Sequence, residues 1–262
     1  TRGDIVFLID QFRRAARRSL EAGVDALEIH GAHGYLIGQF LSPYSNLRSD
    51  EYGGTFDNRC RFPLEVIRAI RDEVGPDVPL IYRISADEFI DGGLTLNDTL
   101  SFAEVLDGEE IDLINISAGI YESGVMIVQP MEFPLGGYVY MARAYKDKIR
   151  TPIAVVGRIS DPYQAEAILA EGSADFVTMV RAFHADPHFP KKAIEGRFED
   201  ICLCIACNQG CTDRLRENVP LSCILNPRSA YERQFKIEPA KTCRNVWVAG
   251  GGPAGLMAAR TA

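Results

Sequence analysis

Short apolar runs alternate with stretches of helical periodicity along most of the chain. We predict five strands from the apolar runs, at residues 26–29, 80–85, 113–117, 153–156 and 176–180. Helices are expected at residues 6–22, 59–74 and 140–148, with others starting at Thr95, Asp161 and Asp186. This alternation of strand and helix indicates an α/β fold with a parallel sheet covered by helices.

Several predicted helix ends carry the residues that satisfy free backbone groups. Gly23 follows the first helix, and Gly75-Pro76 follows the second. Thr95 with Asp98 three residues later is a capping-box pattern. Asp161, Pro162 and Gln164 read as an N-cap, a first-turn proline and an N3 glutamine. The boundaries are therefore predicted independently of the apolar runs.

Polar and glycine-rich segments follow the carboxyl end of each predicted strand. They are residues 30–35, 83–87, 117–123, 157–158 and Arg181. Such clustering is typical of the active face of a TIM barrel. A doubly wound sheet has the same alternation, so the pattern by itself leaves both architectures open.

Composition narrows the class of protein. The chain has 262 residues, 47% of them hydrophobic, and a formal net charge of -8. It can bury a core and form more than one domain. The acidic balance argues against nucleic acid or an anionic membrane as partner. No apolar run approaches the roughly 20 residues of a membrane span, and no signal-peptide pattern appears, so we expect a cytoplasmic protein.

His30, His33 and Tyr35 form a polar cluster after the first predicted strand, which we expect to end at Ile29. Gly31 and Gly34 lie between them and permit unusual backbone conformations. Two hydrogen-bond donors and a weak acid there can polarise a carbonyl and deliver a proton. Two other interpretations are open. A histidine at a strand end can be purely structural, and His-x-x-His can be half of a zinc site, but that site lacks a nearby third ligand.

Five of the seven cysteines lie within residues 202–223, which indicates a metal or cluster site more than a disulfide framework. Cys204, Cys207, Cys211 and Cys223 could hold a tetrahedral metal or a cubane cluster. Structural zinc sites usually present two Cys-x2-Cys pairs, and the single Cys223 favours iron–sulfur. Cys202 is interpreted as a spare thiol. Cys60 and Cys243 are interpreted as packing residues.

The last residues predict the start of a nucleotide-binding unit. A strand at 245–249 precedes Gly250, Gly252 and Gly255, and an apolar helix follows. Gly-x-Gly-x-x-Gly between a strand and a helix is a dinucleotide-binding fingerprint. The acidic residue that would distinguish the nucleotides would lie beyond Ala262, so FAD and a nicotinamide nucleotide both remain open.

The contiguous stretch from Glu28 to Gly54 resembles the old yellow enzyme family of FMN-dependent ene-reductases. It is most similar to the larger branch with 2,4-dienoyl-CoA reductase, 2-enoate reductase and trimethylamine dehydrogenase. The 2-3-11 cysteine spacing and the Cys-Asn-Gln-Gly-Cys sequence resemble the [4Fe-4S] site of that branch. The resemblance implies that His30 and His33 bind the activating oxygen of the substrate and that Tyr35 protonates the alkene.

The resemblance also assigns the cofactor contacts. Arg83 would contact the pyrimidine edge of FMN, although an ion pair with Asp87 or Glu88 is the plain alternative. The FMN phosphate would be held by Gly157, Arg158, Val180 and Arg181, and FAD by the glycines of the fingerprint. The loop of residues 46–54 is interpreted as structural, pinned by Asp and Arg pairs.

The resemblance implies a partial TIM barrel, the last five strand-helix units of eight. The preceding strands would lie upstream of Thr1. The expected domains are residues 1–199 of an FMN barrel, residues 200–236 of a [4Fe-4S] segment, and residues 241–262 of an FAD or NAD(P) domain.

The expected function is NAD(P)H-dependent reduction of activated C=C bonds, with electrons passing from FAD through the cluster to FMN. The partner is a small unsaturated carbonyl substrate, and a homo-oligomer is compatible with the sequence. Dienoyl-CoA reductases carry an arginine near Tyr44 and a histidine near Tyr121, and this chain has neither. An enoate, an aromatic acrylate or a steroid enone therefore fits as well as an enoyl-CoA.

Three alternatives remain at this point. Amine dehydrogenases of the trimethylamine type carry tyrosine where this chain has His30, which disfavours that activity. A non-catalytic flavin and iron–sulfur electron-transfer module would have reducible centres without substrate turnover. A scaffold held together by zinc would have neither reducible centres nor substrate turnover.

Overall fold

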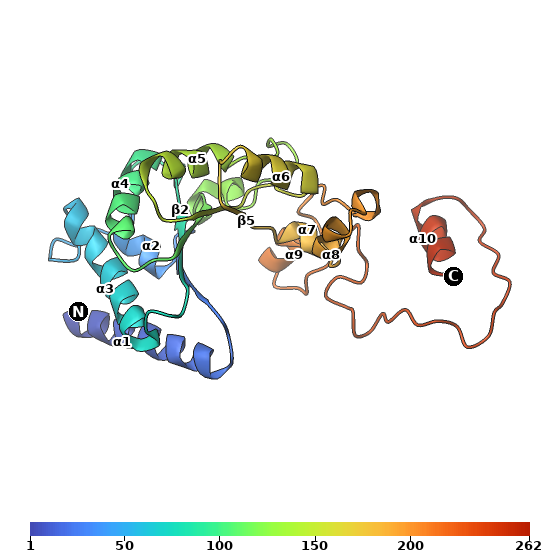
Figure 1. Ribbon diagram of the computed structural model, residues 1–262, viewed down its shortest axis with the longest axis horizontal. Coiled ribbons are helices and arrows are strands. Elements are labelled where there is room, and N and C mark those ends of the chain that lie inside the picture. The colour runs from blue at the N-terminus through green and yellow to red at the C-terminus, as the bar shows by residue number, and fades with distance from the viewer.

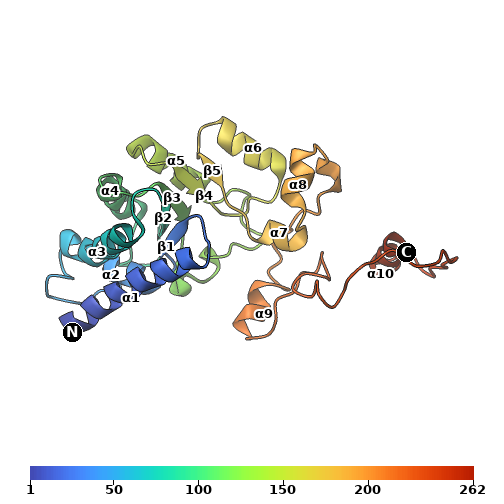
Figure 2. The same ribbon diagram turned by 60° about the horizontal axis from the view of Figure 1, so that its bottom comes forward.

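The computed structural model describes residues 1–262, and its central feature is one five-stranded parallel sheet. The strands are β1 (Leu27–Gly31), β2 (Leu80–Ser85), β3 (Leu113–Ser117), β4 (Ile153–Val155) and β5 (Phe176–Val177). Each strand lies beside the next one in sequence, in the order β1-β2-β3-β4-β5. A doubly wound sheet reverses its strand order at a switch point, and this sheet does not. The order is that of a barrel wall, as Figure 2 shows.

Helices connect the strands and lie outside the sheet (Figure 1). The helices are α1 (Arg2–Glu21), α2 (Leu36–Leu41), α3 (Phe56–Val74), α4 (Leu96–Asp107), α5 (Val139–Lys148), α6 (Pro162–Ala170), α7 (Arg181–Ala185), α8 (Phe189–Ile194), α9 (Thr212–Arg216) and α10 (Pro253–Thr261), with 3-10 turns η1 (Tyr121–Met126) and η2 (Phe198–Asp200). The predicted capping box of Thr95 and Asp98 is present, and Asp161 caps α6.

The two faces of the sheet differ because side chains alternate along a strand. Ile29, Tyr82, Ile114 and Ile153 share one register row and are 0–4% exposed beneath the helices. The neighbouring row on the opposite face contains His30, Arg83 and Asn115. The apolar row anchors the strands in the main core, so the polar row is fixed on the interior face of the barrel wall.

Strand limits differ from the prediction in three strands. β1 continues through His30 to Gly31 because both residues pair with β2. β4 ends at Val155, one residue before the predicted end. β5 ends at Val177 instead of Val180, because it is an edge strand that pairs only with the short β4. The polar residues expected after Val180 therefore follow a loop and not a strand end.

Helix limits also differ. α3 begins at Phe56 after the N-cap Thr55, which precedes the predicted start at Arg59. The last helix of the series begins at Phe189 instead of Asp186, and the short α7 precedes it. Buried Asp186 instead accepts a hydrogen bond from the backbone N–H of Cys202 and pairs with Lys192. That carboxylate ties α8 to the start of the cysteine segment.

The C-terminal stretch is extended and exposed up to α10, which lies away from the sheet (Figure 1). The predicted strand at residues 245–249 does not form, because no other strand is available there to complete its hydrogen bonds. Cys243 is exposed, so its interpretation as a packing residue is wrong, whereas Cys60 is buried in the core. No helix combines the length and the apolar character that crossing a bilayer requires.

Candidate active site

His33 is the most firmly held residue of the predicted cluster. Its φ of 60° turns the chain out of β1, and its backbone N–H donates to Ser85 Oγ at 2.9 Å. Its ring Nε2 lies 2.7 Å from Ser117 Oγ. Ser85 in turn donates to the carbonyl of Gly119 at 2.8 Å. Three adjacent strand ends therefore fix one imidazole.

His30 lies between His33 and Tyr35, with its ring close to both. The His30 ring centroid is 5.1 Å from that of His33 and also 5.1 Å from that of Tyr35. The hydroxyl of Tyr35 lies 2.6 Å from the hydroxyl of Tyr121, which belongs to η1 after β3. The sequence pattern thus brings its three residues together, and the fold adds a second phenol.

Burial and charge determine the protonation of this cluster. Burial lowers the pKa of His33 to about 3, and the positive charges of Arg83 and His30 contribute further. Burial, followed by the charge of Arg83, also lowers the pKa of His30. The hydrogen bond to Tyr121 and then burial raise the pKa of Tyr35. Near neutral pH the site therefore presents two neutral imidazoles and a protonated phenol.

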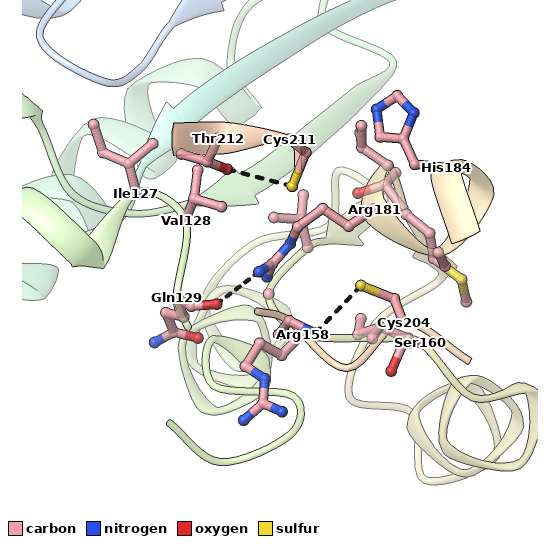
Figure 3. A pocket seen from close by; sticks show the side chains of 18 of the residues that line it. Ile127, Val128, Gln129, Arg158, Ser160, Arg181, His184, Cys204, Cys211 and Thr212 are labelled. Atoms are coloured by element: carbon pink, nitrogen blue, oxygen red, sulfur yellow. Dashed lines mark hydrogen bonds between the residues drawn. The ribbon is translucent and has the colours of Figure 1, made fainter. Parts of the chain in front are cut away.

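A cavity of about 300 Å³ opens beside His33. The cofactor residues expected from the sequence gather here, since its lining includes Arg83, Gly157, Arg158, Val180 and Arg181. Figure 3 shows the Arg181 side chain reaching Gln129, whereas the Arg158 guanidinium points away from that contact and donates to the carbonyl of Met131. His30 and Tyr35 are not in the lining. His30 lies next to His33, and Tyr35 lies next to His30.

Arg83 pairs with a residue of the barrel interior. Its Nη1 lies 3.7 Å from Glu28 Oε1, and Glu28 Oε2 accepts a hydrogen bond from Asn115 at 2.7 Å. The expected alternative, a pair with Asp87 or Glu88, is wrong. Those carboxylates accept hydrogen bonds elsewhere, Asp87 from the backbone of Phe89 and Glu88 from Ser42.

Buried polar atoms without partners concentrate around this cavity. They are Arg83 Nε, Arg158 Nε, Gln129 Oε1 and Tyr138 Oη, four of the seven such atoms in the chain. Buried polar groups are almost always hydrogen-bonded, so these atoms indicate a polar ligand. Gly157 has a φ of 120°, and a Cβ there would lie 2.7 Å from the Tyr138 ring. The donor set and the dimensions of the cavity fit a flavin nucleotide.

The four predicted cluster cysteines line a second, smaller cavity of about 20 Å³. Arg181, His184, Cys204 and Cys211 line both cavities, so the two share a wall. No three His, Cys, Asp or Glu side chains lie close enough together to hold a single metal ion. The sulfurs therefore surround one space without the tight grouping that a mononuclear site needs.

The C-terminal glycines lie apart from both cavities. Gly250 has a φ of 108°, Gly252 caps α10, and a Cβ on Gly255 would lie 1.9 Å from the carbonyl oxygen of Gly250. The glycine turn thus has its tight geometry. The structure does not bring it to the flavin cavity.

Sequence reasoning missed several supporting residues of the site. Ser85 and Ser117 occupy the last positions of β2 and β3, and only the parallel register places their hydroxyls against His33. Glu28 and Asn115 are 87 residues apart in the chain. The only signal in the sequence was a polar residue inside an otherwise apolar strand. Asn208, within the cysteine motif, is the other omission.

Residues 1–200 match the NADH:flavin oxidoreductase / NADH oxidase family, and the chain belongs to it. The NADH oxidase of Thermoanaerobacter brockii is 47% identical over 100% of this chain and 41% of its own length. The chain thus spans about two fifths of this relative.

Solved structures also match the whole chain. A 2-naphthoyl-CoA reductase in complex with 2-naphthoyl-CoA is 37% identical with a TM-score of 0.96, over 100% of this chain and 40% of that one. Histamine dehydrogenase from Rhizobium sp. 4-9 is 34% identical with a TM-score of 0.91, over 100% of this chain and 38% of that one. Reductases and amine dehydrogenases are therefore both relatives.

Proposed function

We propose that this chain is part of an NAD(P)H-dependent flavin and iron–sulfur reductase of activated C=C bonds. The observation that carries the proposal is the arrangement of His30, His33 and Tyr35, two neutral imidazoles and a protonated phenol beside a cavity rich in arginine. Those protonation states suit an electrophile that polarises a carbonyl and an acid that protonates carbon.

The cavity residues support FMN as the resident cofactor. Arg83 would hold the pyrimidine edge, while Gly157 and Arg158 together with Val180 and Arg181 would hold the phosphate. Bound FMN supplies the hydride that an alkene accepts at its β-carbon. A guanidinium suits the phosphate because it donates two parallel hydrogen bonds.

The residues of the chain perform the remaining steps. A neutral imidazole has one N–H donor, so His30 and His33 together offer two hydrogen bonds to the carbonyl oxygen of the substrate. This draws electron density from the β-carbon. Tyr35 then donates its hydroxyl proton to the α-carbon. Tyr121 contacts the Tyr35 oxygen at 2.6 Å and can stabilise the charge left on it.

The four cysteines support a [4Fe-4S] cluster over zinc. One zinc ion bonds each sulfur at about 2.3 Å and so draws four sulfurs to within about 4 Å of each other. In a cubane each thiolate binds a different iron, so the sulfurs stay wider apart around one space. The four cysteines surround such a space. The shared wall supports electron exchange between the cluster and the flavin cavity.

We propose residues 1–199 as part of the FMN barrel, 200–236 as the cluster segment, and 241–262 as the start of an FAD-binding domain. NAD(P)H would reduce the FAD held by that domain. The substrate class is a small unsaturated carbonyl compound, either an enoate, an enone or an enoyl-CoA.

Replacing Tyr35 with phenylalanine tests the proposal. In the holoprotein, Tyr35→Phe should slow alkene turnover by about 10²–10⁴, the usual contribution of a general acid. Flavin reduction by NAD(P)H should stay unchanged, because the phenol takes no part in it. Stopped-flow absorbance separates the two half-reactions. Unchanged alkene turnover would remove Tyr35 from the proposed role.

Oxidation of an amine is the second candidate, since histamine dehydrogenase is among the relatives. The two candidates differ in the direction of electron flow. Anaerobic assays of the holoprotein against enoates, enones and methylated amines distinguish them. Bleaching of the oxidised flavin by an amine, with no alkene turnover, would favour the dehydrogenase.

A further inference from the structure

Asn208 lies inside the cysteine motif, between Cys207 and Cys211, and its side chain points away from the cysteine loop. Its Oδ1 accepts a hydrogen bond from Arg181 Nη1 at 2.8 Å. Its Nδ2 donates to the carbonyl of Val128 at 3.0 Å. One amide therefore contacts both the arginine at the start of α7 and the loop of residues 127–129.

Both contacts of Asn208 belong to the wall of the flavin cavity. Val128, Gln129 and Arg181 line that cavity, and Arg181 also donates to the carbonyl of Gln129 at 2.8 Å. Figure 3 shows the Arg181 side chain extending to Gln129, with Cys204 and Cys211 nearby. The three residues and Asn208 form a closed hydrogen-bonded set that joins the cysteine loop to the flavin cavity.

The backbone of Asn208 is fixed by its own loop. It has a φ of 60°, and its carbonyl accepts hydrogen bonds from the Asp213 N–H at 3.1 Å and from the Cys211 thiol at 3.8 Å. A cluster held by Cys207 and Cys211 would clamp this loop on both sides of Asn208. Without it, the segment is short of regular structure, since only the five-residue α9 follows.

We propose that Asn208 is a positioning residue that couples the cysteine loop to the flavin cavity, so that FMN binds tightly only when the iron–sulfur cluster orders that loop. An ordered loop holds Asn208 in place, and Asn208 holds Arg181 and the carbonyl of Val128. A loose loop releases Arg181 from the position in which it meets the phosphate. The coupling rests on the cofactors of the proposed function and is independent of the substrate.

Asn208→Gly in the holoprotein is the direct test, because glycine accepts a φ of 60° without strain. We expect iron and sulfide contents to be unchanged and the Kd for FMN to rise about tenfold, the effect of one lost hydrogen bond to a charged group. Fluorescence titration of flavin-stripped protein measures that Kd. Asn208→Asp keeps the acceptor for Arg181 and should recover most of the affinity.

Asn226→Ala is the matched control. Asn226 also ties the cysteine segment to α7 through an amide, donating to the carbonyl of His184 at 2.9 Å, but it makes no hydrogen bond to residues 127–129. Its Kd for FMN should stay at the value of the unsubstituted protein. An equal loss in both variants would mean general loosening of the segment and would overturn the specific role of Asn208.

A second measurement tests the proposal even where the Asn208→Gly variant loses its cluster. Removing the cluster from the unsubstituted holoprotein with a chelator should weaken FMN binding by a similar factor, since a loop without its cluster no longer holds Asn208 against Arg181 and Val128. The proposal would be overturned if removal of the cluster left the Kd for FMN unchanged. It would also be overturned if Asn208→Gly kept its cluster and bound FMN as tightly as the unsubstituted protein. These binding measurements stand even if no alkene is turned over.

Discussion

Four non-glycine residues around the two cavities adopt left-handed backbone conformations. Their φ values are 60° for His33, 50° for Arg158, 56° for Ala206 and 60° for Asn208, and only three other non-glycine residues in the chain have positive φ. Each such residue costs on the order of 1–3 kcal/mol. The chain tolerates that cost where the turn aims a side chain or loop at a cavity, as it does for His33.

Burial of His33 predicts a pH dependence of stability. Its pKa falls from about 6.5 in the unfolded chain to about 3 in the folded one, so between these values the unfolded state binds a proton that the folded state does not. The contribution of His33 to the unfolding free energy is full above pH 6.5 and falls as the pH drops toward 3. Denaturant unfolding between pH 4 and 7 gives the unfolding free energy at each pH. The slope of that free energy against pH should be smaller for His33→Gln than for the unsubstituted protein, by an amount equivalent to about one proton.

The control for that experiment is His188→Gln on the surface. This variant replaces an exposed imidazole that makes no side-chain hydrogen bond, so it controls for the loss of a histidine as such. A slope for His33→Gln equal to that of the unsubstituted protein would contradict a half-buried, neutral imidazole at His33.

At the scale of elements, the site depends on how β1 meets its neighbours. Gly31 ends the strand directly above the buried Tyr82, and the chain then turns at His33 toward β2 and β3. Tyr82 is 0% exposed, so any movement of its ring has to displace other core side chains. The missing side chain at Gly31 therefore permits the close approach that places His30 and His33 side by side.

Gly31→Ala should destabilise the protein by about 1–3 kcal/mol, the usual cost of overpacking a core. The added Cβ would lie 2.2 Å from the Tyr82 hydroxyl oxygen. Gly108→Ala is a matched control, because it has a negative φ and its Cβ would only approach the carbonyl of Val105 at 3.4 Å. Thermal unfolding of both variants checks the comparison. Equal melting temperatures would show that Tyr82 can yield.

At the scale of the whole molecule, the barrel wall and the cysteine segment meet at one shared wall, lined by Arg181, His184, Cys204 and Cys211. The half-buried guanidinium of Arg181 lines both cavities, and its partial burial lowers its pKa while Cys204 and Cys211 oppose that shift. This arrangement places the two proposed redox groups next to each other.

The proposed cluster predicts the metal content of the holoprotein. Iron and acid-labile sulfide should each be present at about four per chain, with the broad visible absorbance of an iron–sulfur protein. Cys207→Ser should lose most of both, because it removes a proposed ligand. Cys202→Ser should retain them, since Cys202 is not in the lining of the cysteine cavity. One zinc per chain without visible absorbance would support the scaffold alternative instead.

The sequence by itself determined the features that depend on near neighbours in the chain. Strand and helix order, the capping of α4 and α6, the polar cluster after the first strand and the cysteine spacing all follow from local patterns. Such patterns set which face of an element is apolar and where backbone groups need caps. Most strands were predicted within two residues, and the failures at β5 and residues 245–249 occurred where pairing partners are few.

Only the tertiary structure decided what depends on distant segments. Strand order distinguished a barrel wall from a doubly wound sheet, because alternation does not encode which strand pairs with which. The register brought Ser85 and Ser117 to His33 and placed Glu28 against Arg83. The contact between Asn208 and Arg181 joins residues 27 positions apart across two loops. Hydrogen bonds of this kind leave no periodic trace in a sequence, so folding alone assembles the site.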